Sequence, residues 1–66
     1  MTTYRACTTD LTIYATDENG ETFDMNATGE PCRSVDDLVC FVNEMHALAD
    51  FCDDATRDAL LAQIAA

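Results

Sequence analysis

The sequence contains no lysine and no tryptophan, and its apolar runs are all too short to cross a membrane. A membrane-spanning helix needs about 20 consecutive apolar residues, so we expect no membrane association. Binding to nucleic acid or to an anionic membrane needs many cationic side chains, and three arginines are too few. The first residues, MTTYRACT, also lack the charged start and apolar stretch of a signal peptide, which predicts a cytoplasmic protein.

Negative charge is what the sequence has in excess. Thirteen aspartates and glutamates face three arginines, and the formal net charge is −10. Such a balance destabilises the folded chain through self-repulsion, but it speeds the encounter with a positively charged partner. Two interpretations stay open at this point: a basic macromolecular partner, or an acidity that serves solubility or adaptation to salt. Because 48% of the residues are hydrophobic, we do not expect a disordered chain.

The segment LTIYATDENGETFDMNA predicts a β-hairpin, because two alternating runs flank Asn19-Gly20. A two-residue loop would mix polar and apolar side chains on each face, whereas the three-residue loop 18–20 pairs Ile13 with Met25 and Ala15 with Phe23. The second register gathers one apolar face, which a one-sided sheet requires: Leu11, Ile13, Ala15, Phe23, Met25 and Ala27. Gly20 then takes the left-handed position of a bulged turn. Residues 2–8 predict a third strand, with Tyr4 and Ala6 facing inward.

The second half of the chain predicts two helices. Ser34 is a good N-cap for the first helix, whose wide apolar stripe comprises Val35, Leu38, Val39, Phe41, Val42, Met45, Leu48 and Ala49. Asp53 or Asp54 caps a shorter second helix, which buries Leu60, Leu61 and Ile64. Strands followed by helices indicate an α+β fold. We therefore expect a single small domain, residues 1–66, with a three-stranded antiparallel sheet packed against two α-helices.

Neither a metal ion nor another cofactor is predicted. The cysteines at positions 7, 32, 40 and 52 lack the C-x-x-C spacing of zinc sites. The segment DENGETFD has its glycine at the fourth rather than the sixth position of a calcium loop, and it lacks the bidentate glutamate. In a reducing cytosol the thiols stay free, and we expect Cys7 and Cys52 to be small core residues.

The residues also argue against an enzyme. So short a chain cannot supply the walls of a deep substrate pocket. His46 lies at the edge of the apolar stripe, where a boundary residue is expected, and no partner orients it for nucleophilic catalysis. Paired-carboxylate catalysis needs a desolvated acid, whereas these acids fall on exposed faces. Arg57 follows Asp53 by four residues, which predicts an i,i+4 ion pair.

The polar side of the first helix carries two features of interest. It comprises Asp36, Asp37, Cys40, Asn43, Glu44, Ala47 and Asp50. Cys40, Glu44, Ala47 and Phe51 form a narrow stripe, here the Cys40–Phe51 stripe, at spacings i, i+4, i+7 and i+11. This stripe either packs on the second helix or forms a contact with a partner or a second copy. A partner contact would suit an antitoxin-like or adaptor module, and the chain would be a monomer or a weak homodimer.

The second feature is a line of acids on the same helix. Asp37 and Glu44 are separated by a rise of about 10.5 Å, close to three phosphate steps of about 3.4 Å along one DNA strand. Arginine and lysine sites that grip phosphate accept carboxylates in similar geometry. The line continues toward Asp53, Asp54 and Asp58, so the segment DFCDDATRD indicates a phosphate-like surface. A solvated face is the alternative.

The chain from MTTYRACTTDLTIYATDENGETFDMNA through SVDDLVCFVNEMHALADFCDD resembles the small phage-encoded anti-CRISPR proteins in size, acidity and strand-then-helix layout. The resemblance implies a cytoplasmic inhibitor in the host bacterial cell, acting on a type I CRISPR effector, with type I-C the first expectation. It implies that the chain occupies the basic surface that recognises the PAM or duplex DNA and so blocks target binding. The transferable property is negative charge, carried by Asp36, Asp37, Glu44, Asp50, Asp53 and Asp54. The hairpin acids Asp17, Glu18, Glu21 and Asp24 offer a second acidic face.

Overall fold

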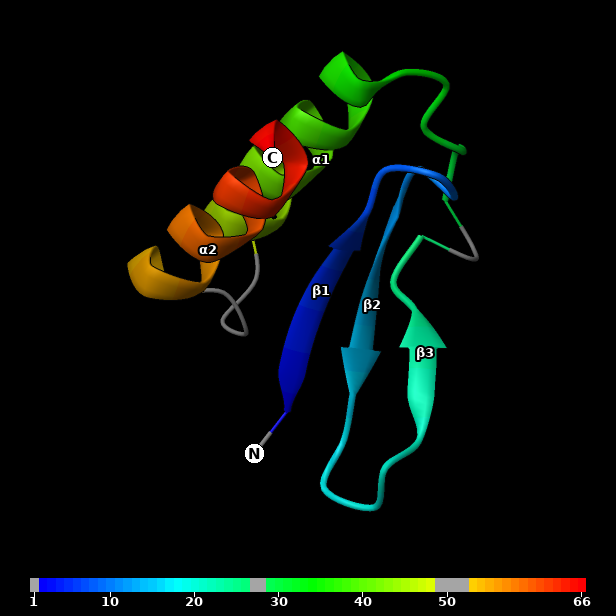
Figure 1. The fold of residues 1–66 in the computed structure, drawn as a ribbon, viewed down its shortest axis with the longest axis vertical. Helices are drawn as coiled ribbons and strands as arrows, with labels where there is room; N and C mark the ends of the chain where they lie inside the picture. The colour runs from blue at the N-terminus through cyan, green and yellow to red at the C-terminus, as the bar shows by residue number, and fades with distance from the viewer. Residues whose placement is uncertain (1, 27–28, 49–52) are drawn as a thin grey trace.

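Three strands come first in the chain and two helices follow, as the sequence predicts (Figure 1). The computed structural model describes residues 2–26, 29–48 and 53–66. The elements are β1 (Thr3–Cys7), β2 (Thr12–Thr16), β3 (Thr22–Asp24), α1 (Val35–Leu48) and α2 (Asp54–Ala65). The strands form one antiparallel sheet in the order β1-β2-β3. The predicted α+β fold, a three-stranded antiparallel sheet packed against two helices, is confirmed.

The register of the β2–β3 hairpin is the one that the three-residue loop predicts. Ala15 pairs with Phe23, and the amide of Met25 donates to the carbonyl of Ile13 at 2.9 Å. Gly20 has a φ of +83°, the left-handed conformation that glycine adopts at no steric cost. The side chain of Asp17 accepts hydrogen bonds from the amides of Asn19 and Glu21, which closes the turn.

The core lies where the two helices meet the sheet. Its buried residues are Ile13 from β2, Leu38 and Val42 from α1, and Leu60 and Ile64 from α2. Tyr4 and Ala6 of β1 pack against this cluster, as expected. Leu61 is only half-buried, although the sequence predicts a buried residue there. The helix α2 lies against β1 and is held there by a hydrogen bond from the amide of Ala6 to Oε1 of Gln63 at 2.8 Å.

Two predicted core residues are exposed. Phe23 shares the apolar face with Ala15 but is 49% exposed, because α2 packs on β1 while β3 lies at the opposite edge of the sheet (Figure 1). Val35 is 44% exposed, because it begins α1 where the helix extends beyond the ends of the strands (Figure 1). Leu11 is half-buried in the turn before β2 with a φ of +54°. Ala27 and Ala49 lie outside the described residues.

Both helices begin at the residues that the sequence marks. The hydroxyl of Ser34 accepts a hydrogen bond from the amide of Asp37 at 3.1 Å. Asp53 is the N-cap of α2, and its side chain accepts from the amide of Thr56 at 2.8 Å. In the described part of the chain, neither helix has the length and apolarity that crossing a membrane requires.

Candidate functional site

The exposed side of α1 carries three of the acids predicted for partner binding. Asp36, Asp37 and Glu44 are all exposed. Within residues 2–26, 29–48 and 53–66, none of the three forms an ion pair. Asp37 has a structural role nonetheless, because its Oδ2 accepts from the backbone amide of Arg33 at 2.9 Å. Asp36 and Glu44 therefore present the carboxylates that are most available to a partner.

A hollow of about 240 Å³ opens beside these acids, between the 30–32 segment and α1. We call it the acidic hollow, and it is lined by Glu30, Pro31, Cys32, Asp37, Cys40, Phe41 and Glu44. It brings together Asp37 and Glu44, which the helical spacing placed on one face. It also adds Glu30, which the sequence reasoning missed. The only hint was the breaker segment ATGEPCR directly before the helix, and no spacing rule folds such a segment back onto the helix.

Cys32 is the more buried of the two thiols that line the acidic hollow, since Cys40 is exposed. Burial is the first cause of the raised pKa of Cys32, and the negative charges of Asp37 and Glu44 raise this pKa further. The thiol is thus protonated at neutral pH. Cys32 also packs against the core, whereas Cys7, the expected core residue, is half-buried at the end of β1 with its sulfur 3.5 Å from Oδ2 of Asp10. Cys52 lies outside the described residues.

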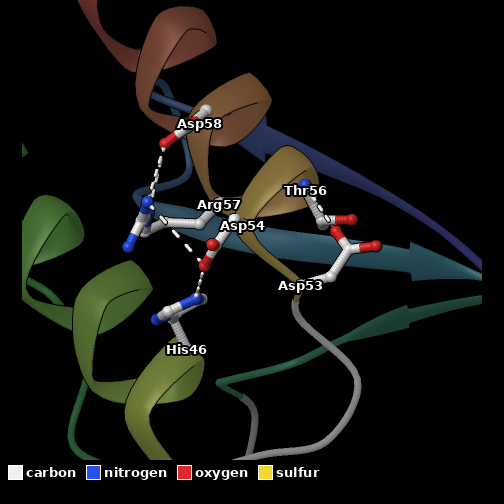
Figure 2. Close-up of polar contacts among 6 residues, drawn as sticks. All are labelled: His46, Asp53, Asp54, Thr56, Arg57 and Asp58. Atoms are coloured by element: carbon white, nitrogen blue, oxygen red, sulfur yellow. Dashed lines mark hydrogen bonds and ion pairs between the residues drawn. The ribbon is translucent and has the colours of Figure 1, made fainter.

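A second group of acids surrounds the N-terminus of α2 (Figure 2). Oδ1 of Asp54 lies 2.7 Å from Nε2 of His46 and 3.9 Å from a guanidinium nitrogen of Arg57. Arg57 also contacts Asp58 at 3.1 Å. His46 is a half-buried boundary residue, as predicted, but it has an orienting partner in Asp54 that the sequence did not reveal. The side chains at this end of the molecule largely satisfy one another.

The predicted ion pair between Asp53 and Arg57 is wrong. The carboxylate of Asp53 is used to cap α2, and hydrogen bonds from the backbone and side chain of Thr56 lower its pKa, with a smaller contribution from His46. Arg57 turns instead to Asp54 and Asp58, as Figure 2 shows. An N-cap residue directs its side chain back at the first turn, so it is not available to the residue four positions later.

The predicted acids therefore fall into two groups. Asp36, Asp37 and Glu44 lie on α1, where Asp37 and Glu44 line the acidic hollow, and Asp53 and Asp54 lie at the start of α2. Asp54 contacts His46, which is nine residues after Asp37, a rise of about 13.5 Å along α1. Asp50 lies outside the described residues.

The Cys40–Phe51 stripe and the hairpin acids are the other surfaces that the sequence singles out. Cys40, Glu44 and Ala47 are exposed, so this part of the stripe is not buried beneath α2, and Phe51 lies outside the described residues. In the hairpin, Asp24 accepts from the hydroxyl of Thr12 and from the amide of Asn26. Among the residues that the structure places, no group of three or more histidines, cysteines and acids is arranged to hold a metal ion.

Comparison of the chain with models of protein families, with curated proteins and with solved structures finds no match. The acidic surface of α1 is therefore the feature of this chain that bears most directly on a function.

Proposed function

We propose that this chain is an acidic protein inhibitor that binds the basic DNA-recognition surface of a nucleic-acid-binding protein and blocks access of DNA to it. One observation carries the proposal. Asp36 and Glu44 are exposed on a regular helix without an ion-pair partner among the described residues, and Glu30 and Asp37 line the acidic hollow together with Glu44. A rigid array of carboxylates of this kind matches arginine and lysine side chains that are spaced to hold phosphates.

The positions of the cations support the choice of face. Arg57 is engaged by Asp54 and Asp58 at the start of α2. The guanidinium of Arg5 lies 4.9 Å from the ring centroid of Tyr14 on the sheet. Neither of these two arginines offsets the charge on the exposed side of α1. The third, Arg33, precedes α1 and contacts Asp37 through its backbone amide, and its side chain forms no ion pair among the described residues. A partner with a positive surface is therefore attracted to this side of the molecule.

For the partner we propose a type I CRISPR effector, and type I-C first. The basis is the resemblance in size, acidity and layout to small phage-encoded anti-CRISPR proteins. The surface that recognises the PAM or duplex DNA in such an effector is basic, because it binds phosphates. Occupation of that surface by Asp36, Asp37 and Glu44 would exclude DNA by competition, without any chemical reaction and without a cofactor.

A pair of double variants tests the choice of face. Asp36→Asn with Glu44→Gln removes two exposed carboxylates that form no ion pair among the described residues, and Glu18→Gln with Glu21→Gln removes two from the hairpin, so the charge change is matched. Exposed ion pairs contribute about 0.2–1 kcal/mol each, so the first variant should weaken competition with DNA by roughly 2- to 30-fold. The hairpin variant should change it much less. A folded first variant with full inhibition would contradict the proposal.

An antitoxin-like or adaptor module is the second candidate. The exposure of Cys40 and Ala47 favours it, because small residues on an open helix face allow close approach of a partner. This function predicts that Phe51→Ala weakens partner binding more than any acid substitution does, and that salt has little effect on affinity. A pull-down with the wild-type chain and this variant, at low and moderate salt, separates the two candidates.

A further inference from the structure

The acidic hollow is small enough to suit a single side chain rather than a whole ligand. Its volume of about 240 Å³ lies below the roughly 300–1,000 Å³ of pockets that hold small-molecule ligands. Phe41 and Pro31 contribute apolar surface, and Phe41 is held in place because it packs against the core. The hollow is therefore a shallow receptor with one rigid aromatic residue in its wall.

The charge of the hollow selects a cation. Glu30 from the loop and Asp37 and Glu44 from α1 line it, and none of the lining residues is cationic. The same two α1 carboxylates contribute, after burial, to the raised pKa of the Cys32 thiol. A group that enters this hollow gains the most binding free energy if it is positively charged and has a flat apolar face.

Arginine meets both requirements better than lysine. Its guanidinium is planar and weakly hydrated, and it stacks on aromatic rings while its N–H groups donate in pairs to carboxylates. The lysine ammonium is a compact and strongly hydrated charge, so it gains less from the apolar wall. The hollow thus offers both kinds of contact that a guanidinium makes: stacking on the ring of Phe41 and hydrogen bonds to the carboxylates of Asp37 and Glu44.

We propose that the acidic hollow receives an arginine side chain from the basic surface of the partner, with the guanidinium facing Asp37 and Glu44 and resting on Phe41. This inference rests on the proposed function, which supplies the basic surface, and it names the residue type that anchors the contact. An arginine that binds phosphate in the free partner would be sequestered in the hollow. DNA would then lose one of its phosphate contacts with the partner, in addition to being excluded from the partner's surface.

The test uses the full chain and a small probe, so it does not depend on the partner. N-acetyl-arginine amide is titrated into the ¹⁵N-labelled chain at low ionic strength, and amide shifts are followed by NMR. Saturable shifts are expected at residues 30–32 and 37–44. The neutral analogue N-acetyl-citrulline amide should give no saturable shifts there, and N-acetyl-lysine amide should bind more weakly than the arginine probe.

Four variants sharpen the result. Glu44→Gln should weaken the probe's apparent affinity roughly two- to five-fold, as expected for one exposed ion pair, and Glu21→Gln in the hairpin should leave it unchanged. Cys40→Phe fills the hollow without changing the charge and should abolish the saturable shifts, whereas Cys40→Ser should keep them. Circular dichroism checks that each variant is folded.

The inference is overturned if citrulline amide produces the same shifts, or if the hairpin amides respond as strongly as the hollow. Unchanged affinity in both folded Glu44→Gln and Cys40→Phe would also overturn it. Such a result would leave the proposed function standing, because that function is tested on the effector. Conversely, the arginine probe could bind saturably while the chain has no effect on DNA binding by the effector. That result would support the hollow as an arginine site and reject the proposed partner.

Discussion

Replacing Leu38 by alanine should remove a large share of the folding free energy. Leu38 is fully buried, and among the described residues it belongs to a core cluster of five buried residues: Ile13, Leu38, Val42, Leu60 and Ile64. A buried Leu→Ala change costs about 2–5 kcal/mol, because packing is lost and a cavity remains. A chain of 66 residues has a total stability of roughly 3–10 kcal/mol. The variant should therefore lose a large share of its stability and unfold at a much lower urea concentration than the wild-type chain.

Val35→Ala is the matched control on the same helix. Val35 belongs to the same predicted stripe but is 44% exposed, so its truncation should change the unfolding free energy by no more than about 0.5 kcal/mol. Urea denaturation followed by circular dichroism measures both. Since about 1 kcal/mol shifts the melting temperature of a small domain by roughly 4–8 °C, the difference is easily resolved. Similar losses for the two variants would refute the orientation of α1, and with it the assignment of Asp36 and Glu44 to the exposed side.

Three further predictions follow from the same structure. Because the folded-state pKa of Asp53 is lowered, its charge stabilises the fold above the unfolded pKa of about 3.9, and this contribution is lost as the pH falls through that value and below it. Urea titrations should therefore show that the unfolding free energies of the wild-type chain and Asp53→Asn differ at about pH 6. This difference should shrink as the pH is lowered into the acid range. Raising the salt from about 0.1 M to about 1 M should increase the melting temperature, because the Debye length falls from about 10 Å to about 3 Å and screens the self-repulsion; a decrease would contradict the importance of that repulsion. Phe23→Thr should cost little stability in calorimetry, since the side chain is 49% exposed, and a loss as large as that of Leu38→Ala would mean that β3 is covered.

The elements that local sequence determines were predictable. Asn19-Gly20 and the alternation around it fixed the loop length, and through it the pairing of Ala15 with Phe23. Ser34 and Asp53 marked the helix starts, because a side-chain oxygen at an N-cap satisfies an amide that the helix leaves free. These features depend on neighbours a few residues apart, which is the range that periodicity and capping rules describe.

The remaining features depend on how far one element covers another. Periodicity places Phe23 and Val35 on the apolar faces, but it does not say that α2 packs on β1 or that α1 extends past the strands. The acidic hollow also depends on how two segments pack, since it forms only because the 30–32 segment lies beside α1. The partner of Arg57 was mispredicted because spacing rules treat side chains in pairs, whereas the carboxylate of Asp53 was already used by the cap.

The most direct test of the central claim is DNA binding by a purified type I-C effector complex while this chain is titrated in, at low and at moderate salt. We expect DNA binding to be lost at low salt, and more of the chain to be needed as the salt rises, because screening weakens the contact between carboxylates and basic residues. DNA binding that stays undisturbed at every concentration and at both salt levels would contradict occlusion of that effector by the acidic surface of α1.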